Sequence, residues 1–190
     1  MKALVYLTSF ALVCSLNACT HMVGKDYPKY LENNVGESQL PATDKADQYY
    51  LPPQTKSFSY EFRSFITGVG NKWVVEIGKM LDDTLKSVDV QKAFGTLAAV
   101  DSESAPGTTL VFELQDYKFE DFRAKISLNV KLMKTGTPAF EKNYTKEGKE
   151  QGGKMFLGGT FAQKNAVQQS TKLVLDEILR ELIADLSGLQ

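Results

Sequence analysis

The chain has 190 residues, of which 43% are hydrophobic and 24% are charged, the balance of an ordinary globular protein. Its formal charge of −1 at pH 7 creates no bulk positive field, which argues against binding to nucleic acid or to an anionic membrane surface. The length suits one domain plus a tether.

The first residues have the pattern of a secretory signal. Lys2 supplies a single positive charge, and an apolar run from Ala3 to Val13 follows it, as export signals require. This run is too short to span a bilayer, which takes about 20 apolar residues. We therefore predict a signal peptide over residues 1–18.

The signal ends in Leu16-Asn17-Ala18-Cys19. The aliphatic residue three positions before the cysteine and the small residue directly before it resemble the lipobox of bacterial lipoproteins, although Asn17 stands where that family more often has a small or hydroxyl residue. The resemblance implies that Cys19 is the lipidation site, with diacylglycerol on its thiol and an acyl chain, such as palmitate, on its amino group after cleavage. The alternative is an ordinary signal peptide with a cysteine nearby.

The residue after the cysteine bears on the destination of the chain. Thr20 is not the aspartate that retains such lipoproteins in the inner membrane of enterobacteria-like systems. By the same resemblance we expect a lipid anchor in the outer membrane and a domain that faces the periplasm, with exposure at the cell surface left open. Loss of Lys2 with the signal takes Lys plus Arg from 22 to 21 against 23 acids, so the mature chain carries −2.

Few reactive groups remain for catalysis. Cys14 leaves with the signal and Cys19 would be acylated, so the domain has no cysteine for a disulfide. The one histidine, His21, lies beside the anchor, which excludes Ser-His, Cys-His and the common zinc sites from the domain. The pairs Asp82-Asp83 and Glu120-Asp121 are better explained as solvated charge. We expect no enzyme activity, no metal and no cofactor.

Residues 19–56 are interpreted as the lipidated cysteine and a flexible tether. Their composition shifts to Pro, Asn, Asp, Gln, Ser and Thr after Cys19. Several larger apolar residues in this segment indicate either that part of the tether lies on the domain or that these are scattered surface residues: Tyr27, Tyr30, Tyr49, Tyr50 and Leu51.

Residues 57–190 are predicted to form the periplasmic domain. Ser57–Ile66 alternates in polarity, as expected of a half-buried strand. From Asn71 onward, apolar residues at steps of four and three predict one amphipathic helix, within which Gly78 permits close packing; they are Trp73, Ile77, Leu81, Leu85 and Val88.

The second half of the domain predicts a hairpin-rich sheet and a long helix. Ala93–Val100 is a weak strand candidate, and Asp101–Gly107 reads as a loop. The clearest elements are strands at Thr108–Lys118, Arg123–Lys134 and Ala139–Lys146, a turn at Thr135-Gly136-Thr137-Pro138, and a helix over Phe161–Leu186 that ends at Gly188. The order of elements predicts an α+β fold, an antiparallel sheet of four or five strands with two helices packed on one face.

Two groups of residues are candidates for binding. Met155, Phe156 and Leu157 lie between glycine pairs, and the phosphate-loop pattern fails there because Gly159 stands where its lysine must be. These three residues form either a partner or membrane contact, or a loop that caps the core. The aromatic residues Phe58, Tyr60, Phe62 and Trp73 belong either to the core or to an apolar, lipid-binding cleft between sheet and helices.

The assembled pattern resembles the auxiliary lipoprotein components of ABC-type transporters, with YajG-like lipoproteins as a second family of similar plan. The residues that carry the resemblance are Cys19, Tyr49-Tyr50-Leu51-Pro52-Pro53, Trp73 at the start of a helical pattern, the strand pair from Leu110 to Met133, and the terminal helix. The stretch between Pro53 and Trp73 is shorter than is usual in that family and leaves room for one strand.

The resemblance implies a non-enzymatic accessory lipoprotein of an envelope lipid-transport complex. Its expected partners are the membrane, through the N-terminal lipid anchor, an envelope protein complex and phospholipid. The alternative is a structural or regulatory lipoprotein of another envelope machine, in secretion, flagellar or peptidoglycan-synthesis assembly. An enzyme that uses carboxylates alone is the third class.

Overall fold

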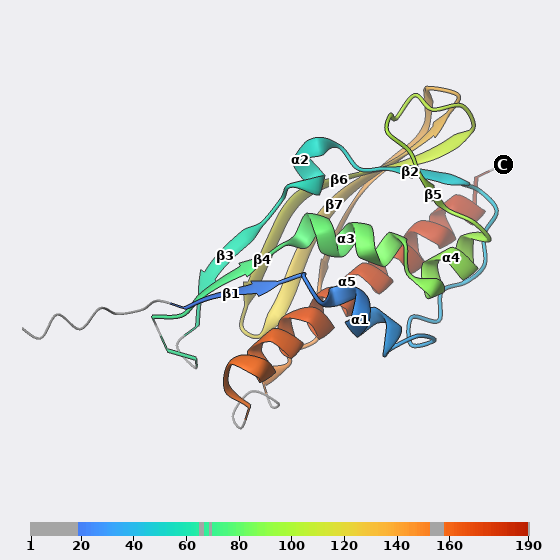
Figure 1. Ribbon diagram of the computed structural model, residues 1–190. Coiled ribbons are helices and arrows are strands. Elements are labelled where there is room, and N and C mark those ends of the chain that lie inside the picture. The colour runs from blue at the N-terminus through green and yellow to red at the C-terminus, as the bar shows by residue number, and fades with distance from the viewer. Residues whose placement is uncertain (1–18, 65–66, 69, 153–157, 190) are drawn as a thin grey trace, which may run out of the picture.

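The computed structural model describes residues 19–64, 67–68, 70–152 and 158–189. Over these residues the chain has an α+β fold with a three-stranded sheet, a five-stranded sheet and five helices (Figure 1). Both sheets contain parallel and antiparallel pairs. The α+β class is therefore confirmed, whereas a purely antiparallel sheet with two helices is not what the chain forms.

The five-stranded sheet has the strand order β5-β2-β6-β7-β8. Its long strands are joined by two-residue turns whose central residues, Asp121-Phe122 and Thr135-Gly136, all have positive φ, the conformation that matches the twist of a hairpin. Short β2 runs parallel to both β5 and β6, while β6, β7 and β8 are antiparallel. The bounds are β2 Gln48–Tyr50, β5 Ala98–Ala99, β6 Thr108–Glu120, β7 Arg123–Lys134 and β8 Thr137–Glu147.

One face of this sheet is core and the other is wet. Along β7, buried Ile126, Leu128 and Val130 alternate with partly exposed polar residues, as the sequence predicts. In β6 the register shifts between Leu114 and Asp116. This bulge inserts one residue, so the buried positions change from even to odd numbers and the core face continues to the end of the strand.

The three-stranded sheet has the order β1-β4-β3. β1 (Thr20–Val23) is parallel to β4 (Lys72–Val75), which is antiparallel to β3 (Tyr60–Arg63). Aromatic rings join β3 to β6: Tyr60 meets Tyr117 at a centroid distance of 5.6 Å, and Phe62 meets Phe119 at 5.4 Å.

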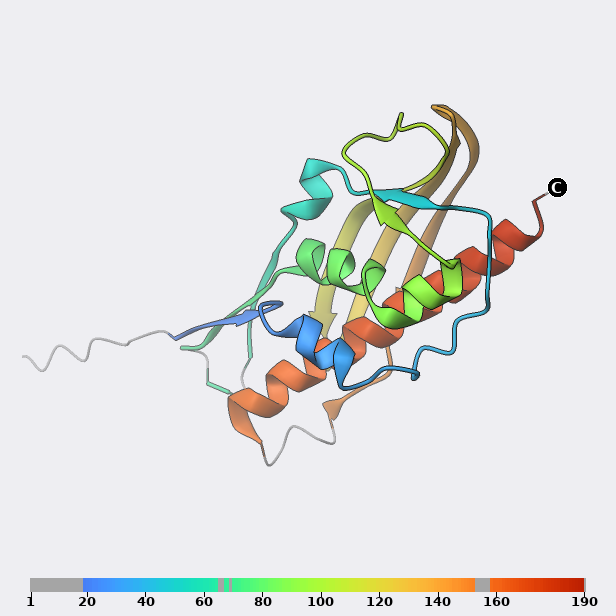
Figure 2. The same cartoon turned by 45° about the vertical axis from the view of Figure 1, so that its right-hand side comes forward.

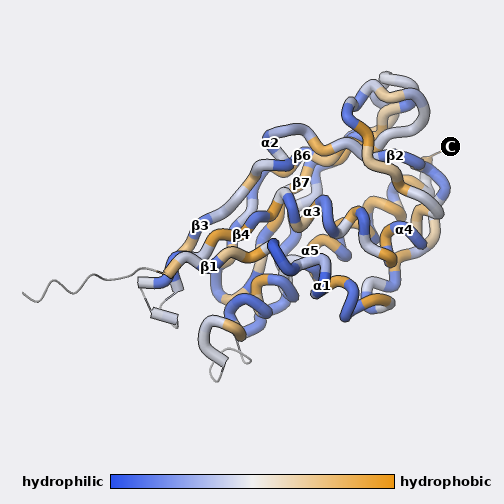
Figure 3. The backbone as a smooth tube through the Cα atoms, viewed as in Figure 1, coloured by the Kyte–Doolittle hydropathy of each residue, from blue (hydrophilic) through white to orange (hydrophobic). Residues whose placement is uncertain are grey.

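Helices cover one face of the larger sheet, as Figures 1 and 2 show. The long C-terminal helix α5 (Gly159–Ser187) packs on β7 and β8, and α3 (Ile77–Leu85) packs beside it. Hydrophobic and hydrophilic residues are interleaved along strands and helices (Figure 3), as expected of elements with one face in the core. The shorter helices are α1 Tyr27–Glu32, α2 Pro53–Lys56 and α4 Val88–Phe94.

The prediction of a flexible tether in residues 19–56 is wrong, because residues 20–56 belong to the fold. They form β1, α1, β2 and α2, and several of their larger apolar side chains are buried in the core, Val23, Tyr27, Tyr49 and Leu51 among them. The prolines mislead because they occupy positions that tolerate them: Pro28 and Pro53 lie in the first turns of α1 and α2, where a missing N–H costs nothing.

Because residues 19–56 were interpreted as a tether, the parallel strand pairs were not predicted from the sequence. β1 and β2 come from the segment taken as a tether, and each aligns with strands far along the chain. Parallel neighbours need a long connection between them, and here the chain between β1 and β4 supplies it.

The single helix predicted from Asn71 to Val88 is also wrong at both ends. Trp73 lies in β4, where buried Trp73 and Val75 alternate with half-buried neighbours, and the helix begins only at Ile77. A second helix, α4, starts after Ser87, whose hydroxyl accepts a hydrogen bond from the amide of Val90 at 3.5 Å. The β-branched pair that follows Trp73 favours a strand locally.

The folded state should lose stability at alkaline pH, because it buries tyrosine side chains in their neutral form. Burial raises the pKa of Tyr27 and Tyr117 far above 10.0, although the hydroxyls of Thr84 and Thr171 are hydrogen-bonded to them at 3.4 and 2.9 Å. The unfolded state therefore loses these protons first as pH rises. Each phenol should remove about 1.4 kcal/mol of stability per pH unit above about pH 10.

The measurement is urea unfolding between pH 9 and 11, with phenolate absorbance as the second signal. Tyr117→Phe should lower the slope of stability against pH. An unchanged slope in that variant would contradict the assignment of Tyr117 as a buried neutral phenol.

Candidate functional site

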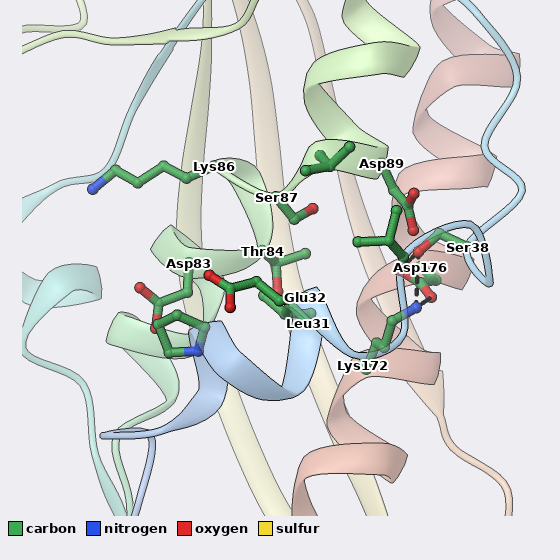
Figure 4. Close-up of a pocket in the computed structure, with 13 residues that line it drawn as sticks. Leu31, Glu32, Ser38, Asp83, Thr84, Lys86, Ser87, Asp89, Lys172 and Asp176 are labelled. Atoms are coloured by element: carbon green, nitrogen blue, oxygen red, sulfur yellow. Dashed lines mark hydrogen bonds and ion pairs between the residues drawn. The ribbon is translucent and has the colours of Figure 1, made fainter.

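A cleft opens between α1, the junction of α3 and α4, and α5 (Figure 4). Its volume is about 260 Å³. Its lining includes Leu31 of α1, Thr84 of α3, Val88 of α4, and Lys172 and Asp176 of α5. The cleft thus exists only where elements from both ends and the middle of the chain meet.

A buried ion pair lies at one side of this cleft. Lys172 and Asp176 are one turn apart on α5, their side chains are 4% and 7% exposed, and the Nζ–Oδ2 distance is 2.6 Å. The hydroxyl of Ser38 accepts from the Lys172 ammonium at 2.8 Å and donates to Asp176 Oδ1 at 3.0 Å. Burial raises the pKa of Asp176 above its usual value, and the adjacent ammonium opposes that rise.

The three side chains act as a clamp on the chain segment that follows α1. Arg180 adds a hydrogen bond from its Nη2 to the carbonyl oxygen of Ser38 at 2.9 Å. Lys172 Nζ is hydrogen-bonded to both Ser38 and Asp176. The geometry favours a structural role for this buried clamp.

The rim of the cleft is apolar with acidic neighbours. Val35 is 50% exposed and Val88 is 58% exposed. Asp89 holds the rim together by accepting a hydrogen bond from the amide of Gly36 at 2.8 Å, and Glu32 and Lys86 are further charged members. Exposed valines flanked by carboxylates suit a ligand that offers an apolar group next to positive charge.

The predicted aromatic cleft is mostly core. Trp73 is 1% exposed and stacks on His21 at a centroid distance of 4.6 Å and on Phe62 at 6.2 Å. Phe58 and Tyr60 are half-buried and pack against the core cluster. The structure thus stacks Tyr60, Phe62 and Trp73 in one row of rings, and Phe58 packs against the same core cluster.

The interface between the larger sheet and α5 is also filled. Leu128 and Val130 of the sheet and Val174 and Ile178 of the helix are all buried to within 1%. Of the two alternatives that the sequence leaves open for this interface, packed core and lipid cleft, the described residues form the packed core.

One aromatic hollow remains open beside the hairpin of β6 and β7. Phe62, Phe119 and Phe122 line it, and its volume is about 330 Å³. The hydroxyl of Ser64 donates to Gln163 Oε1 at 3.1 Å at its margin. Among the four predicted aromatic residues, Phe62 is the member that lines this hollow.

Cys19 is exposed and carries a free thiol. Its carbonyl oxygen accepts a hydrogen bond from the amide of Lys72 at 3.0 Å, so it adjoins the three-stranded sheet. Lipidation of Cys19 remains an expectation from the lipobox pattern. The predicted contact residues Met155, Phe156 and Leu157 lie outside the described residues.

Two searches for other kinds of site found none in the described ranges. No group of three or more His, Cys, Asp or Glu residues lies close enough there to hold a metal ion. None of the helices in residues 19–189 that the structure describes is long and apolar enough to cross a membrane.

Comparison with known proteins gives matches in structure alone. No family model matches the chain, and no curated protein matches its sequence. The protein XCC0632 from Xanthomonas campestris, of the DUF330 family, is similar with 17% identity and a TM-score of 0.46 over 77% of this chain and 87% of that one. A minor lipoprotein from Acinetobacter baumannii is similar with 11% identity and a TM-score of 0.44 over 78% of this chain and 94% of that one.

Sequence reasoning missed the cleft and its clamp. Ser38 and Val35 belong to the segment interpreted as a tether, and Val88 was placed on the buried stripe of a longer helix. One local signal was present in the sequence: Lys172 and Asp176 have the spacing of an ion pair within a helix.

Proposed function

We propose that this chain is a non-enzymatic, lipid-anchored accessory lipoprotein of the bacterial outer membrane, with its domain in the periplasm, and that it serves an ABC-type lipid-transport complex. The observation that carries the proposal is the lipobox pattern ending at Cys19, joined to a domain that begins at the next residue. The acyl chains contribute about 0.8 kcal/mol per buried methylene, so an anchor with several chains is stable.

The cleft supports binding of protein as the way in which the domain serves its complex. Val35 and Val88 expose apolar surface beside Glu32 and Asp89. The matching partner is a protein segment that presents an apolar side chain next to lysine or arginine. The filled interface between sheet and α5 supports protein over phospholipid as the ligand of the domain.

The same cleft supports the alternative function, an adaptor of another envelope machine. An apolar rim with carboxylates can bind any segment of fitting shape that carries apolar and basic side chains. The identity of the bound subunit therefore distinguishes the two proposed functions. Secretion, flagellar and peptidoglycan-synthesis assemblies are the candidates for the alternative.

The test is site-specific photo-crosslinking of the full chain in living cells. A photoreactive residue at position 88 should capture one subunit of a lipid-transport complex, whereas the same residue at exposed Ser104, in the loop between β5 and β6, should not. Capture of a subunit of another machine would establish the alternative. Equal capture at both positions would remove the cleft from the proposal.

The anchor is tested separately. Cys19→Ser, exported behind a signal peptide whose cleavage needs no lipid, should lose acylation and move nearly all of the protein from the membrane fraction to the soluble fraction, because no other lipid attachment is expected. Mass spectrometry of the N-terminal peptide identifies the acyl chains. Full retention of the cleaved variant in the membrane fraction would overturn the proposed anchor.

A further inference from the structure

The lipid attachment point adjoins a regular strand. Beyond the hydrogen bond from Lys72 to the Cys19 carbonyl oxygen at 3.0 Å, Thr20 begins β1 and pairs with Lys72. No spacer residue therefore separates an acylated Cys19 from the fold. An anchor at this position holds one end of the domain at the bilayer instead of suspending the domain at a distance.

Two large apolar side chains are exposed beside this attachment point. Met22 is 43% exposed and Phe161 is 72% exposed. Both line a shallow hollow of about 300 Å³ that also includes Thr20 and Lys164. β1 and the first turn of α5, far apart in sequence, thus contribute to one surface.

The distances suit contact with a membrane surface. A strand rises about 3.3 Å per residue, so Met22 lies within about 10 Å of Cys19 along β1. Apolar side chains of interfacial proteins lie about 5–10 Å into the boundary between headgroups and acyl chains. Met22 can therefore reach that boundary while Cys19 remains attached to its lipid, and Phe161 lies across the same hollow.

We propose that Met22 and Phe161 form a membrane-contact face that seats the domain directly on the bilayer carrying its anchor. The inference rests on the proposed lipidation of Cys19, and its occupant is the phospholipid surface. It deepens the proposed function by setting the orientation of the domain. α4, which begins at Val88, lies away from β1 in Figures 1 and 2, so this wall of the cleft stays free for a partner when β1 faces the membrane.

The experiment uses the acylated mature chain in vesicles of phosphatidylethanolamine and phosphatidylglycerol. Phe161→Cys and Met22→Cys each introduce the sole free thiol, because Cys14 leaves with the signal and Cys19 is acylated. An environment-sensitive fluorophore on that thiol reports its surroundings. Val88→Cys is the matched control, since Val88 is likewise an exposed apolar residue, at 58%.

Nitroxide-labelled lipids should quench the fluorophore at positions 22 and 161 about threefold or more above position 88, because the quencher is confined to the bilayer. The emission at positions 22 and 161 should also shift to the blue. Equal quenching at positions 161 and 88, on chains that float with the vesicles, would overturn the membrane-contact face and leave the anchor intact. An N-terminal peptide without acyl chains would overturn the anchor itself, and with it this inference.

Discussion

Replacing Gly78 by alanine should destabilise the fold by about 2–3 kcal/mol, the usual cost of overpacking a core. Gly78 lies at the start of α3, against α2. An added Cβ would overlap the carbonyl oxygen of Thr55 and lie 2.6 Å from that of Lys56. Alanine improves the helix propensity of α3 by about 1 kcal/mol, which offsets only part of this clash.

The neighbours of Gly78 cannot move freely, because both contacts are with backbone atoms. The hydroxyl of Thr55 accepts a hydrogen bond from the amide of Leu114 at 3.0 Å, which fixes α2 on β6. The amide of Gly78 donates to the carbonyl oxygen of Phe58 at 3.0 Å. A shift of α2 would strain both hydrogen bonds.

Urea unfolding followed by the fluorescence of Trp73, the only tryptophan, measures this effect. Gly70→Ala is the matched control, because nothing lies within 4 Å of a Cβ added there, and its cost should stay within about 0.5 kcal/mol. Equal unfolding midpoints for the two variants would show that α2 adapts, contrary to this prediction.

Removal of one partner from the buried clamp should reduce the stability of the fold more than the Gly78 substitution does. Lys172→Met leaves Asp176 buried without its counter-ion, for which the expected loss of stability is about 3–5 kcal/mol. The exposed pair Lys86–Asp82 has the same spacing on a helix, with Nζ 2.5 Å from Oδ2. Lys86→Met should therefore cost only about 0.5 kcal/mol.

The loss of stability caused by Lys172→Met should increase with pH. Loss of the ammonium raises the pKa of Asp176 further, because burial is then opposed only by the Ser38 hydrogen bond and the charge of Arg180. With the folded-state pKa above the unfolded-state value, the neutral carboxyl stabilises the fold at low pH and this contribution is lost as pH rises. The difference in stability from the parent chain should thus be smaller at about pH 5 than at about pH 8.

The double variant Lys172→Met/Asp176→Asn separates charge from packing. Asparagine keeps an acceptor for the Ser38 hydroxyl and removes the unpaired charge, so the double variant should be more stable than Lys172→Met alone. A double variant as unstable as the sum of the two single variants would show that the pair is not coupled.

The second half of the domain could be predicted from local patterns. β7 has the predicted bounds, Arg123–Lys134, and α5 extends the predicted helix by one or two residues at each end. In both elements one apolar face is repeated over many residues, at a period of two or of 3.6, so the average over the element outweighs single exceptions. The turn at Thr135-Gly136 follows from the same local chemistry.

The candidate site could not be predicted in this way. The clamp joins Ser38 to Lys172 and Asp176, which lie more than a hundred positions away. No residue near Ser38 in the sequence indicates this contact. Val88 is exposed rather than buried because α3 ends at Leu85 and α4 starts anew at Val88. The spacing of the apolar residues alone predicts one continuous helix in place of α3 and α4.

Local order of residues was enough to predict the α+β class, the β6–β8 hairpins and the long C-terminal helix, and it is enough to define the lipobox pattern at Cys19. That residues 20–56 are folded became apparent from the three-dimensional contacts. β1 and β2 have only four and three residues, and their stability comes from hydrogen bonds to β4 and β6 and from burial of residues such as Val23 and Tyr49. Such long-range contacts leave no periodic trace in the sequence, yet here they position both the cleft and the exposed surface beside Cys19.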